Sequence, residues 1–551
     1  MKVLVVGGVA GGASAAARLR RLTEAAEITI FERGPYVSFA NCGLPYFIGD
    51  IIEEESKLLV ATPAKFKKWF NVDVQDNTEV ISIDRKAKTI TARNVLTGEQ
   101  RSHAYDALVL SPGAAPLKPP LPGVDLPGIF SVKTVPDSRA IKAWIAEHSV
   151  KQAVVVGGGF IGIEMVENLV HRGIKTTLVE MLPQVMPPFD PEMVEPVHER
   201  LAAKGVELCL GDGLKAFEQQ AGGNGLVVHT ASGKALPADL ALLVVGVRPE
   251  TSLAKEAGLT LGQRGIAVDA HMRTSDPSIY AVGDAVEIKD WVTGQQTLIP
   301  LAGPANRQGR IAADNIAGRS STFRGSQGSS VVGIFGLTLA GTGASEKTLK
   351  RLSIPYRKVY IHAGHHAGYY PGAKTIDLKL LFSPEDGKVL GCQAVGEEGV
   401  EKRVDVVAAF MQKGGTVFDL EEAELCYAPQ YGSAKDPVNL AGMVASNVMR
   451  GDHPVEHWDA VDWPAVAADP SALIVDVREP GEVARGAVEG AVNFPLSSLR
   501  EKLHELPQDK KLYVYCQVGL RGYNATRQLL LAGKDAVNVS GGFRSWQQAK
   551  L

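Results

Sequence analysis

An apolar run followed at once by a glycine-rich turn and a helix-forming stretch occurs twice in this chain, near residue 7 and near residue 157. This pattern is typical of βαβ units, which build parallel sheets covered by helices. Alternation of apolar runs with Ala-rich stretches such as 13–22 supports the same architecture. We predict an α/β fold whose first strands are 2–6, 27–31, 107–110, 153–156, 175–179 and 240–244.

Composition and charge exclude several classes of protein. The 551 residues are enough for about three to five domains. Because 58 Lys and Arg nearly balance 61 Asp and Glu, a basic nucleic-acid surface is not expected. Five widely spaced cysteines do not predict a disulfide framework. The N-terminus reads as a buried strand, and the uncharged stretch 325–345 is too rich in Gly and Ser to span a membrane. We expect a soluble, cytoplasmic protein.

The second glycine-rich turn carries a complete dinucleotide fingerprint. In VVVGGGFIGIEMVENL, Gly157, Gly159 and Gly162 lie between an apolar strand and a helix, and Glu180 ends the next strand. The glycines allow a tight turn and close approach of a pyrophosphate, and the acid accepts hydrogen bonds from the ribose. Glu180 would repel a 2′-phosphate, so NADH is favoured over NADPH.

The first turn, VVGGVAGGASAA, keeps Gly7 and Gly12 but has Val9 at the central glycine position, and Glu32 closes the next strand. A later segment, TSDPSIYAVGDAVE, places Asp284 directly after a strand. The layout resembles the pyridine nucleotide-disulfide oxidoreductase family over roughly residues 1–450. The resemblance implies FAD at the first turn, with Asp284 bound to the flavin ribityl chain, and NAD(P)H at the second.

The segment SFANCGLPYF places Cys42 in a turn soon after the first ribose-binding acid. Many reductases of the family use two cysteines five positions apart, but position 47 is Phe47. Without a second cysteine nearby, Cys42 can carry electrons only by pairing with an external sulfur or by oxidising to a sulfenic acid. These options define two enzyme hypotheses. The other cysteines of the reductase part have no motif, and we expect Cys209, Cys392 and Cys426 to be inert.

The same segment resembles coenzyme A-disulfide reductases and their relatives, the NADH oxidases and peroxidases. The oxidase and peroxidase branch usually carries a His in the first glycine-rich turn, where positions 9–11 read VAG. Two further segments, HAGYYPGA and YAPQYGSAKDPVN, are similar to the coenzyme A branch, in which two tyrosines of the partner subunit reach the active site. The resemblance assigns them to Tyr369 and Tyr427, with Tyr370 as the alternative to Tyr369. A phenol can donate a hydrogen bond or a proton to a leaving sulfur.

The resemblance also implies a coenzyme A site. Arg18 and Arg21 lie three positions apart, so they share one face of the first helix. The chain departs from the family pattern at Phe70, where a lysine is usual, and Lys67 or Lys68 are possible substitutes. The residues that the resemblance assigns to coenzyme A are Ser14, Arg18, Arg21, Ser38, Asn41, Asn306 and Lys435.

The last 90 residues closely resemble a single rhodanese domain. Cys516 ends a strand, 517–521 form a short loop, and a helix follows. Loop amides and the helix dipole would stabilise a thiolate or persulfide, and Arg521 would add a fixed positive charge. A cysteine phosphatase has five residues between Cys and Arg, whereas this loop has four, which favours sulfur. An inactive binding domain is the other alternative. Asp476, Arg478 and Glu479 are expected to brace the fold and the loop.

The fold class that follows is α/β, with two Rossmann-like nucleotide-binding domains for FAD and NAD, an α+β dimerisation domain and a C-terminal rhodanese α/β domain. The resemblance implies a homodimer with composite active sites. The predicted bounds are 1–115 and 247–322 for FAD binding, 116–246 for NAD(P)H binding, 323–446 for dimerisation, 447–460 for a linker and 461–551 for rhodanese.

We therefore expect NADH- and FAD-dependent reduction of persulfides or polysulfides, with coenzyme A persulfide as the favoured substrate, sulfide as product and coenzyme A disulfide as a second substrate. Cys516 would transfer sulfane sulfur to coenzyme A or toward Cys42. The alternatives are an NADH peroxidase or oxidase that uses a Cys42 sulfenic acid, and a sulfur carrier or sensor with a vestigial reductase. No metal is expected, because His362, His365 and His366 lack a Cys or acid at ligand spacing and read as a polar loop.

Overall fold

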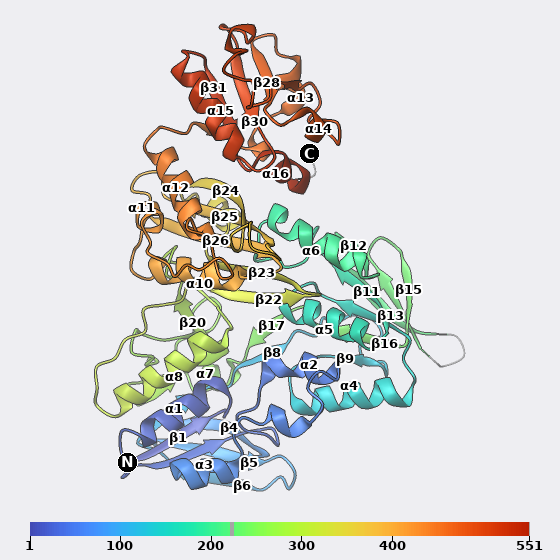
Figure 1. Ribbon diagram of the computed structural model, residues 1–551. Coiled ribbons are helices and arrows are strands. Elements are labelled where there is room, and N and C mark those ends of the chain that lie inside the picture. The colour runs from blue at the N-terminus through green and yellow to red at the C-terminus, as the bar shows by residue number, and fades with distance from the viewer. Residues whose placement is uncertain (221–224, 550–551) are drawn as a thin grey trace. The chain divides into compact units, whose positions relative to one another are not determined.

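The computed structural model describes residues 1–220 and 225–549 (Figure 1). These residues form two compact units, and the chain passes between them more than once. It leaves the first unit after Val185, returns at Gly205 and leaves again after Gly328. No helix among the described residues is both long and apolar enough to cross a membrane. The units are Met1–Val185 with Gly205–Gly328, and Met186–Lys204 with Ser329–Leu551.

The first Rossmann-like sheet has the strand order β19-β7-β1-β2-β3, and all its pairs are parallel. Successive side chains of its strands enter two buried hydrophobic clusters in turn, one on each face of the sheet. This is expected for a sheet covered on both sides. Helix α1 (Ala10–Arg20) follows β1 and packs against α8 (Ala302–Ile316). The strands are β1 (Lys2–Val6), β2 (Glu27–Phe31), β3 (Asp73–Gln75), β7 (Ala107–Leu110) and β19 (Ile279–Ala281).

The second Rossmann-like sheet has the order β12-β11-β10-β16-β9, again with parallel pairs. Helix α5 (Phe160–His171) follows β10, as α1 follows β1, so the two nucleotide-type turns occupy equivalent places. An antiparallel pair, β8 (Ala114–Pro116) with β17 (Val247–Pro249), lies where the chain enters and leaves this domain. The strands of the sheet are β9 (Ile129–Phe130), β10 (Gln152–Val156), β11 (Lys175–Glu180), β12 (Glu207–Leu210) and β16 (Leu240–Leu243).

Smaller elements complete the first unit. Two three-stranded antiparallel sheets, β4-β5-β6 and β13-β14-β15, are inserted one into each Rossmann-like domain. Helix α2 (Leu44–Ile48) packs against α4 (Val135–Glu147) and α5. The remaining elements are α3 (Pro63–Phe70), α7 (Ser252–Glu256), β4 (Thr78–Asp84), β5 (Thr89–Asn94), β6 (Gln100–Ala104), β13 (Leu214–Gln219), β14 (Leu226–Thr230), β15 (Ala235–Ala238), β18 (Ile266–Ala267), β20 (Val286–Lys289) and β21 (Gln296–Thr297).

The second unit begins with a five-stranded antiparallel sheet of order β22-β23-β26-β25-β24. Two of the three inner strands, β25 (Thr375–Phe382) and β26 (Val389–Gly396), are buried on both faces. Helices α6 (Pro191–Ala203), α10 (Val400–Met411) and α12 (Pro437–Met449) pack against the sheet. The other elements are β22 (Ser330–Ile334), β23 (Leu337–Gly343), β24 (Arg357–Gly364), α9 (Glu346–Arg351) and α11 (Val417–Glu421).

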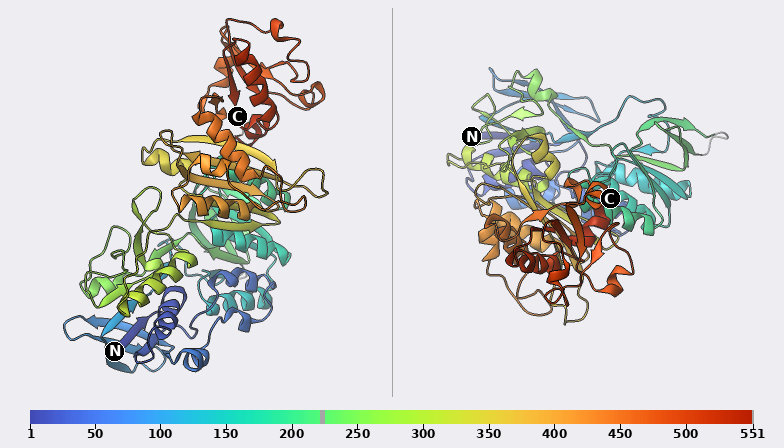
Figure 2. Two further views of the ribbon diagram at one scale, coloured as in Figure 1. Left: turned by 60° about the vertical axis from the view of Figure 1, so that its left-hand side comes forward. Right: turned by 90° about the horizontal axis from the view of Figure 1, so that it is seen from above.

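The C-terminal domain is a parallel sheet of order β27-β31-β30-β28-β29, flanked by helices (Figure 2). Two parts of the predicted linker 447–460 contact this domain: β27 (Val455–Glu456) pairs with β31, and Trp458 is buried in its core. The predicted end of this domain lies outside the described residues. Its other elements are β28 (Ala472–Asp476), β29 (Val492–Asn493), β30 (Lys511–Tyr515), β31 (Ala536–Val539), α13 (Trp463–Ala468), α14 (Pro480–Val483), α15 (Leu520–Leu531) and α16 (Gly542–Ala549).

Candidate functional site

The first glycine-rich turn connects β1 to α1 in a conformation that requires glycine. Gly7 has a φ of 88°, and a Cβ on Gly12 would lie 1.9 Å from the Gly7 carbonyl oxygen. The carboxylate of Glu32 accepts the amides of Gly8 at 2.9 Å and Gly34 at 2.9 Å. Each carboxylate oxygen keeps a free lone pair, so Glu32 can still accept from ribose hydroxyls. The turn and its acid therefore fit a dinucleotide.

Asp284 lies one residue beyond Gly283, after β19 and at the same edge of the sheet as this turn. Burial raises its pKa, and the positive charge of Lys133 lowers the pKa by a smaller amount. The neighbouring amide of Gly283 donates to the Gln308 side chain at 2.7 Å, which links this edge to α8. A half-buried carboxyl at this edge suits the predicted hydrogen bond to a ribityl chain, which stays a prediction.

The second turn has the same construction at the β10–α5 junction. Gly157 has a φ of 110°, and a Cβ on Gly162 would meet the Gly157 carbonyl at 1.9 Å. A Cβ on Gly159, by contrast, would have no neighbouring atom within 4 Å. The chain itself does not need a glycine there, whereas a pyrophosphate approaching the backbone would need one. Glu180 is buried and accepts the amides of Gly158 at 2.6 Å and Leu182 at 2.9 Å.

Cys42 lies in a short 3₁₀ turn, η1 (Asn41–Gly43), directly before α2. The residue reaches the surface. The thiol is nevertheless partly desolvated by the surrounding chain, and this desolvation raises the pKa of Cys42. The negative charges of Glu164 and Asp284 raise it further. Lys133 acts in the opposite direction. The protein alone therefore favours the thiol over the thiolate, and the charge state of Glu164 affects the balance.

Sequence reasoning missed Glu164 and its partner Tyr46. The Tyr46 hydroxyl donates to Glu164 Oε1 over 3.2 Å, which joins α2 to α5. Burial raises the pKa of Glu164 to about 7, although the bond from Tyr46 opposes this. Burial, followed by the charge of Glu164, raises the pKa of Tyr46 to about 12. The available signal was one acid among the apolar residues that open α5.

The predicted coenzyme A residues are divided between the two units. Six of the seven lie in the first unit, and the exposed Lys435 lies in the second. In the first unit, the Ser14 hydroxyl donates to Asn306, which connects α1 to α8. Arg18 is not free, because it forms an ion pair with Asp314 at 2.8 Å. The others in that unit are Arg21, Ser38 and Asn41, with Ser38 in a left-handed conformation (φ 48°) and Asn41 next to Cys42 in η1.

The two predicted tyrosines lie together in the second unit. The hydroxyls of Tyr369 and Tyr427 are 2.7 Å apart, although 58 residues separate them in the chain. The hydrogen bond to Tyr427 raises the pKa of Tyr369. Tyr370 instead packs edge-on against the His366 ring. The geometry favours Tyr369 over Tyr370 as the partner of Tyr427.

Cys516 directly follows β30 and is completely buried. The amide of Gly519 donates to its Sγ over 3.1 Å, and Gly519 has a φ of 106° that favours glycine. We predicted that Arg521 lies in the loop. Helix α15 begins at Leu520, however, so Arg521 lies in the first turn of the helix. The sulfur is therefore held by a backbone amide at the N-terminal end of a helix, where an anion is stabilised.

The charge predicted for Arg521 is present but neutralised. Its Nη1 and Nη2 bind the two oxygens of Glu482 at 2.6 and 2.7 Å. The bond from Arg521 lowers the pKa of Glu482 to about 2. Two of the three residues predicted to brace the fold and the loop contact each other: buried Arg478 binds Asp476 at 2.7 Å and reaches the loop through Gln517 at 3.2 Å. The amide of the third, Glu479, donates to Glu482 at 3.2 Å. Sequence reasoning missed Glu482.

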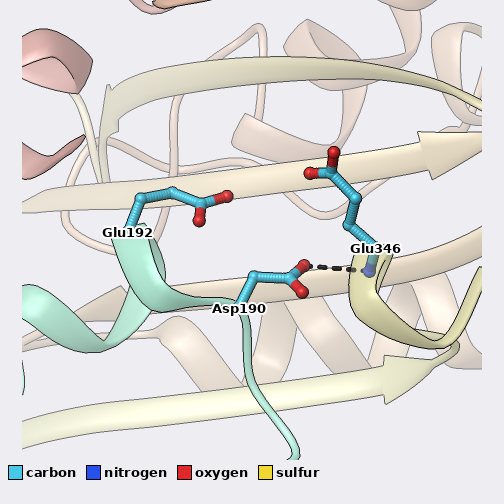
Figure 3. A group of neighbouring side chains, drawn as sticks. All are labelled: Asp190, Glu192 and Glu346. Carbon is cyan, nitrogen blue, oxygen red and sulfur yellow. Dashed lines mark hydrogen bonds between the residues drawn. The ribbon is translucent and has the colours of Figure 1, made fainter. Parts of the chain in front are cut away.

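Three acids converge at the start of α6: Asp190, Glu192 and Glu346 (Figure 3). They have the composition of a cation site, but Lys379 of β25 already supplies the cation. Its fully buried Nζ lies 3.0 Å from Asp190 and 2.6 Å from Glu346, and it also bonds Glu192. The ammonium satisfies the acids, and this cluster holds α6 to the sheet.

We predicted that His362 lies in a polar loop, and this prediction is wrong. It is part of β24, where its Nδ1 is 2.7 Å from Asp377 and its Nε2 is 2.9 Å from the Ser545 hydroxyl of α16. Arg544 and Gln548 of the same helix also bind Asp377. Because side chains alternate between the two faces of a strand, His362 faces helix α16 of the C-terminal domain. No local sequence pattern indicates this contact.

The comparisons with known proteins match this organisation. The family model described as pyridine nucleotide-disulphide oxidoreductase matches residues 1–309, its dimerisation domain matches 329–436, and a rhodanese-like domain matches 458–549. The chain therefore belongs to the pyridine nucleotide-disulphide oxidoreductase family, which binds FAD and NAD(H), and it carries a rhodanese domain. The predicted fold class and enzyme class are confirmed.

Several relatives cover nearly all of their own length. The structure of reduced CoADR-RHD from Bacillus anthracis is 50% identical, with a TM-score of 0.96 over 99% of this chain and 98% of that one. An NAD-dependent persulfide reductase from A. fulgidus is 36% identical, with a TM-score of 0.91 over 99% and 100%.

Two further relatives match about four fifths of this chain. An NADH oxidase of Methanocaldococcus jannaschii is 38% identical over 80% of this chain and 98% of its own length. A coenzyme A disulfide reductase of Staphylococcus haemolyticus is 35% identical over 81% and 100%. The chain is thus a flavin-dependent oxidoreductase, and its relatives are named NADH oxidase, coenzyme A disulfide reductase and NAD-dependent persulfide reductase.

Proposed function

We propose that this enzyme reduces persulfides or polysulfides with NADH and releases hydrogen sulfide, with coenzyme A persulfide as its main substrate and coenzyme A disulfide as a second one. One observation carries the proposal: a single redox cysteine, Cys42, and a rhodanese loop around Cys516 occur on one chain. The likeness to a named persulfide reductase across 99% of the chain supports this combination.

Gly7, Gly12, Glu32 and Asp284 would hold FAD, and Gly157, Gly159, Gly162 and Glu180 would hold NADH. The bound flavin would supply the two-electron chemistry that links NADH to sulfur. Cys42 would attack the persulfide as a thiolate. Attack on the inner sulfur gives a mixed disulfide and hydrosulfide, and attack on the outer sulfur gives a Cys42 persulfide and the thiol. Two electrons and protons then restore Cys42. In total, NADH, one proton and RSSH give NAD⁺, RSH and H₂S.

A pair of tyrosines can supply the proton for the departing sulfur. The Tyr369 and Tyr427 hydroxyls form a hydrogen-bonded pair that can donate to a thiolate. We propose that this pair is contributed by the partner subunit of a homodimer, which the match to the family's dimerisation domain supports. Ser14, Arg21, Ser38, Asn41, Asn306 and Lys435 would bind coenzyme A, with Arg18 contributing only if its pair with Asp314 opens.

Peroxide or oxygen reduction through a Cys42 sulfenic acid is the second candidate, and the likeness to an archaeal NADH oxidase favours it. The deciding experiment is anaerobic NADH consumption by the FAD-loaded enzyme. Coenzyme A persulfide, coenzyme A disulfide and hydrogen peroxide are supplied in parallel, and sulfide is recorded. Fast persulfide turnover with one sulfide per NADH supports the proposal. Turnover with peroxide alone would replace it by the second candidate.

A further inference from the structure

The loop around Cys516 is bordered by arginines, which usually attract anionic sulfur donors. Arg521 lies in the first turn of α15, and its pKa is raised by Glu482 and also by the charge of Cys516, which places it within electrostatic reach of the sulfur. Arg544 is held beside the loop through its amide, which donates to the Gln517 carbonyl at 3.0 Å. Arg478 reaches the Gln517 side chain.

Each of these arginines is matched with a carboxylate. Arg521 forms two hydrogen bonds to Glu482, in a pair whose side chains are 31% and 22% exposed. Such a bidentate pair fixes the guanidinium and occupies two of its five N–H donors. Glu479 adds a second negative charge that acts on Arg521.

The other two arginines are committed in the same way. Buried Arg478 makes three bonds to Asp476. Arg544 directs its guanidinium to Asp377 of β25, at 2.7 and 2.9 Å. Three arginines therefore meet four carboxylates, so these side chains bring no net positive charge to the loop. A doubly charged donor gains nothing from them beyond what the backbone amide and the helix N-terminus supply, whereas a donor with a singly charged or neutral terminal sulfur loses little.

We infer that Glu482 is a specificity-determining residue, which makes the Cys516 site prefer sulfane sulfur carried on a thiol, as a terminal persulfide, over thiosulfate. The inference rests on the proposed function and names the class of sulfur donor that the rhodanese domain uses. Glu482 acts through Arg521, and is therefore a positioning residue and not a catalytic one.

The transfer balances for both donors. With a persulfide anion, the Cys516 thiolate attacks the terminal sulfur, the Cys516–S bond forms, the S–S bond of the donor breaks, and the thiolate RS⁻ leaves with the electron pair. With thiosulfate, the same attack releases sulfite. The two reactions differ in the charge brought to the loop, which is one negative charge or two.

The test measures sulfur transfer to cyanide by the full, FAD-loaded chain without NADH, so that the Cys42 cycle does not contribute. Thiosulfate and the persulfide of an uncharged alkyl thiol serve as donors, and the rate of the Cys516→Ser variant is subtracted. In Glu482→Gln we expect the ratio of kcat/KM for thiosulfate to that for the persulfide to rise about tenfold, mainly through a lower KM for thiosulfate, and less so at high salt.

Two controls separate charge from structure. Glu482→Asp keeps the charge and should keep the wild-type ratio. Glu489→Gln removes an exposed carboxylate of the same domain and should also leave the ratio unchanged. An unchanged ratio in Glu482→Gln, with persulfide transfer intact, would overturn this inference alone. A lack of persulfide-dependent NADH consumption in the anaerobic assay would overturn the proposed reductase function. The ratio of kcat/KM for the two donors could still be measured in that case.

Discussion

The hydroxyl groups of Tyr369 and Tyr427 lie 2.7 Å apart, and both side chains are well exposed. Since the neighbouring aromatic residue Tyr370 packs on His366 instead, the contact selects one pair among several surface tyrosines. Two exposed phenols held together fit the proton-donating role proposed for this pair.

If the pair acts as one proton donor, removing either hydroxyl should remove most of its effect. We expect Tyr369→Phe and Tyr427→Phe each to lower kcat/KM for coenzyme A persulfide by about ten- to a hundredfold. The double variant should be little worse than either single one. Tyr370→Phe is the matched control and should retain activity. Additive losses in the double variant would mean that the hydroxyls act separately.

Cys42→Ser should abolish NADH-coupled reduction of every sulfur substrate, because hydroxyl cannot form the covalent intermediate. Bleaching of the flavin by NADH should persist, since the nucleotide turns are unchanged. Cys209→Ala, which alters a buried cysteine of β12, should retain full turnover. Persulfide reduction at the normal rate by Cys42→Ser would contradict the assignment.

Cys516→Ser should lose sulfur transfer to cyanide but keep NADH-dependent reduction of small persulfides that are supplied ready-made. The reason is that Cys42 lies in the first unit and Cys516 in the second, and the proposal gives them different steps. Measuring both activities on one preparation checks this. Loss of both would show that reduction needs sulfur delivered from the rhodanese loop.

The charge of Glu164 should control how easily Cys42 ionises. Glu164 loses its proton near pH 7, and its negative charge then opposes the Cys42 thiolate. Glu164→Gln removes that charge and should shift the pH profile of Cys42 alkylation by iodoacetamide to lower pH. Glu147→Gln, at an exposed end of α4, should leave the profile in place. A shift to higher pH in Glu164→Gln would reverse the sign argued here.

Asp377→Asn should loosen the contact between α16 and the dimerisation sheet by about 2 kcal/mol, because three donors lose their anionic acceptor. Burial alone would raise the pKa of Asp377, but His362 and Arg544 outweigh burial and lower it. Its contribution is therefore complete at neutral pH and is lost only in strong acid. Faster hydrogen exchange in α16, against Asp405→Asn on the exposed face of α10, checks the expectation.

The strands and the glycine-rich turns could be predicted from the sequence, because local sequence patterns encode them. The strands and both nucleotide turns lie where apolar runs and glycines placed them, since those turns need residues without a side chain. The carboxylates Glu482 and Asp377 could not be predicted, because each acquires its role from a partner brought near only by folding. The same holds for Glu164 beside Cys42. Patterns along the chain locate reactive atoms but not the charges that surround them.

The excursion of the chain through α6 limits how this enzyme can be dissected. An expression clone that stops at Gly328 would still encode 186–204, yet it would lack the sheet that covers Met193, Val194, Val197 and Leu201. It would also leave Asp190 without the Lys379 ammonium. Such a fragment would display a bare apolar helix to solvent and would tend to precipitate. The nucleotide-binding half is joined to the rest of the chain at three crossings, after Val185, Lys204 and Gly328, so no single cut releases it intact.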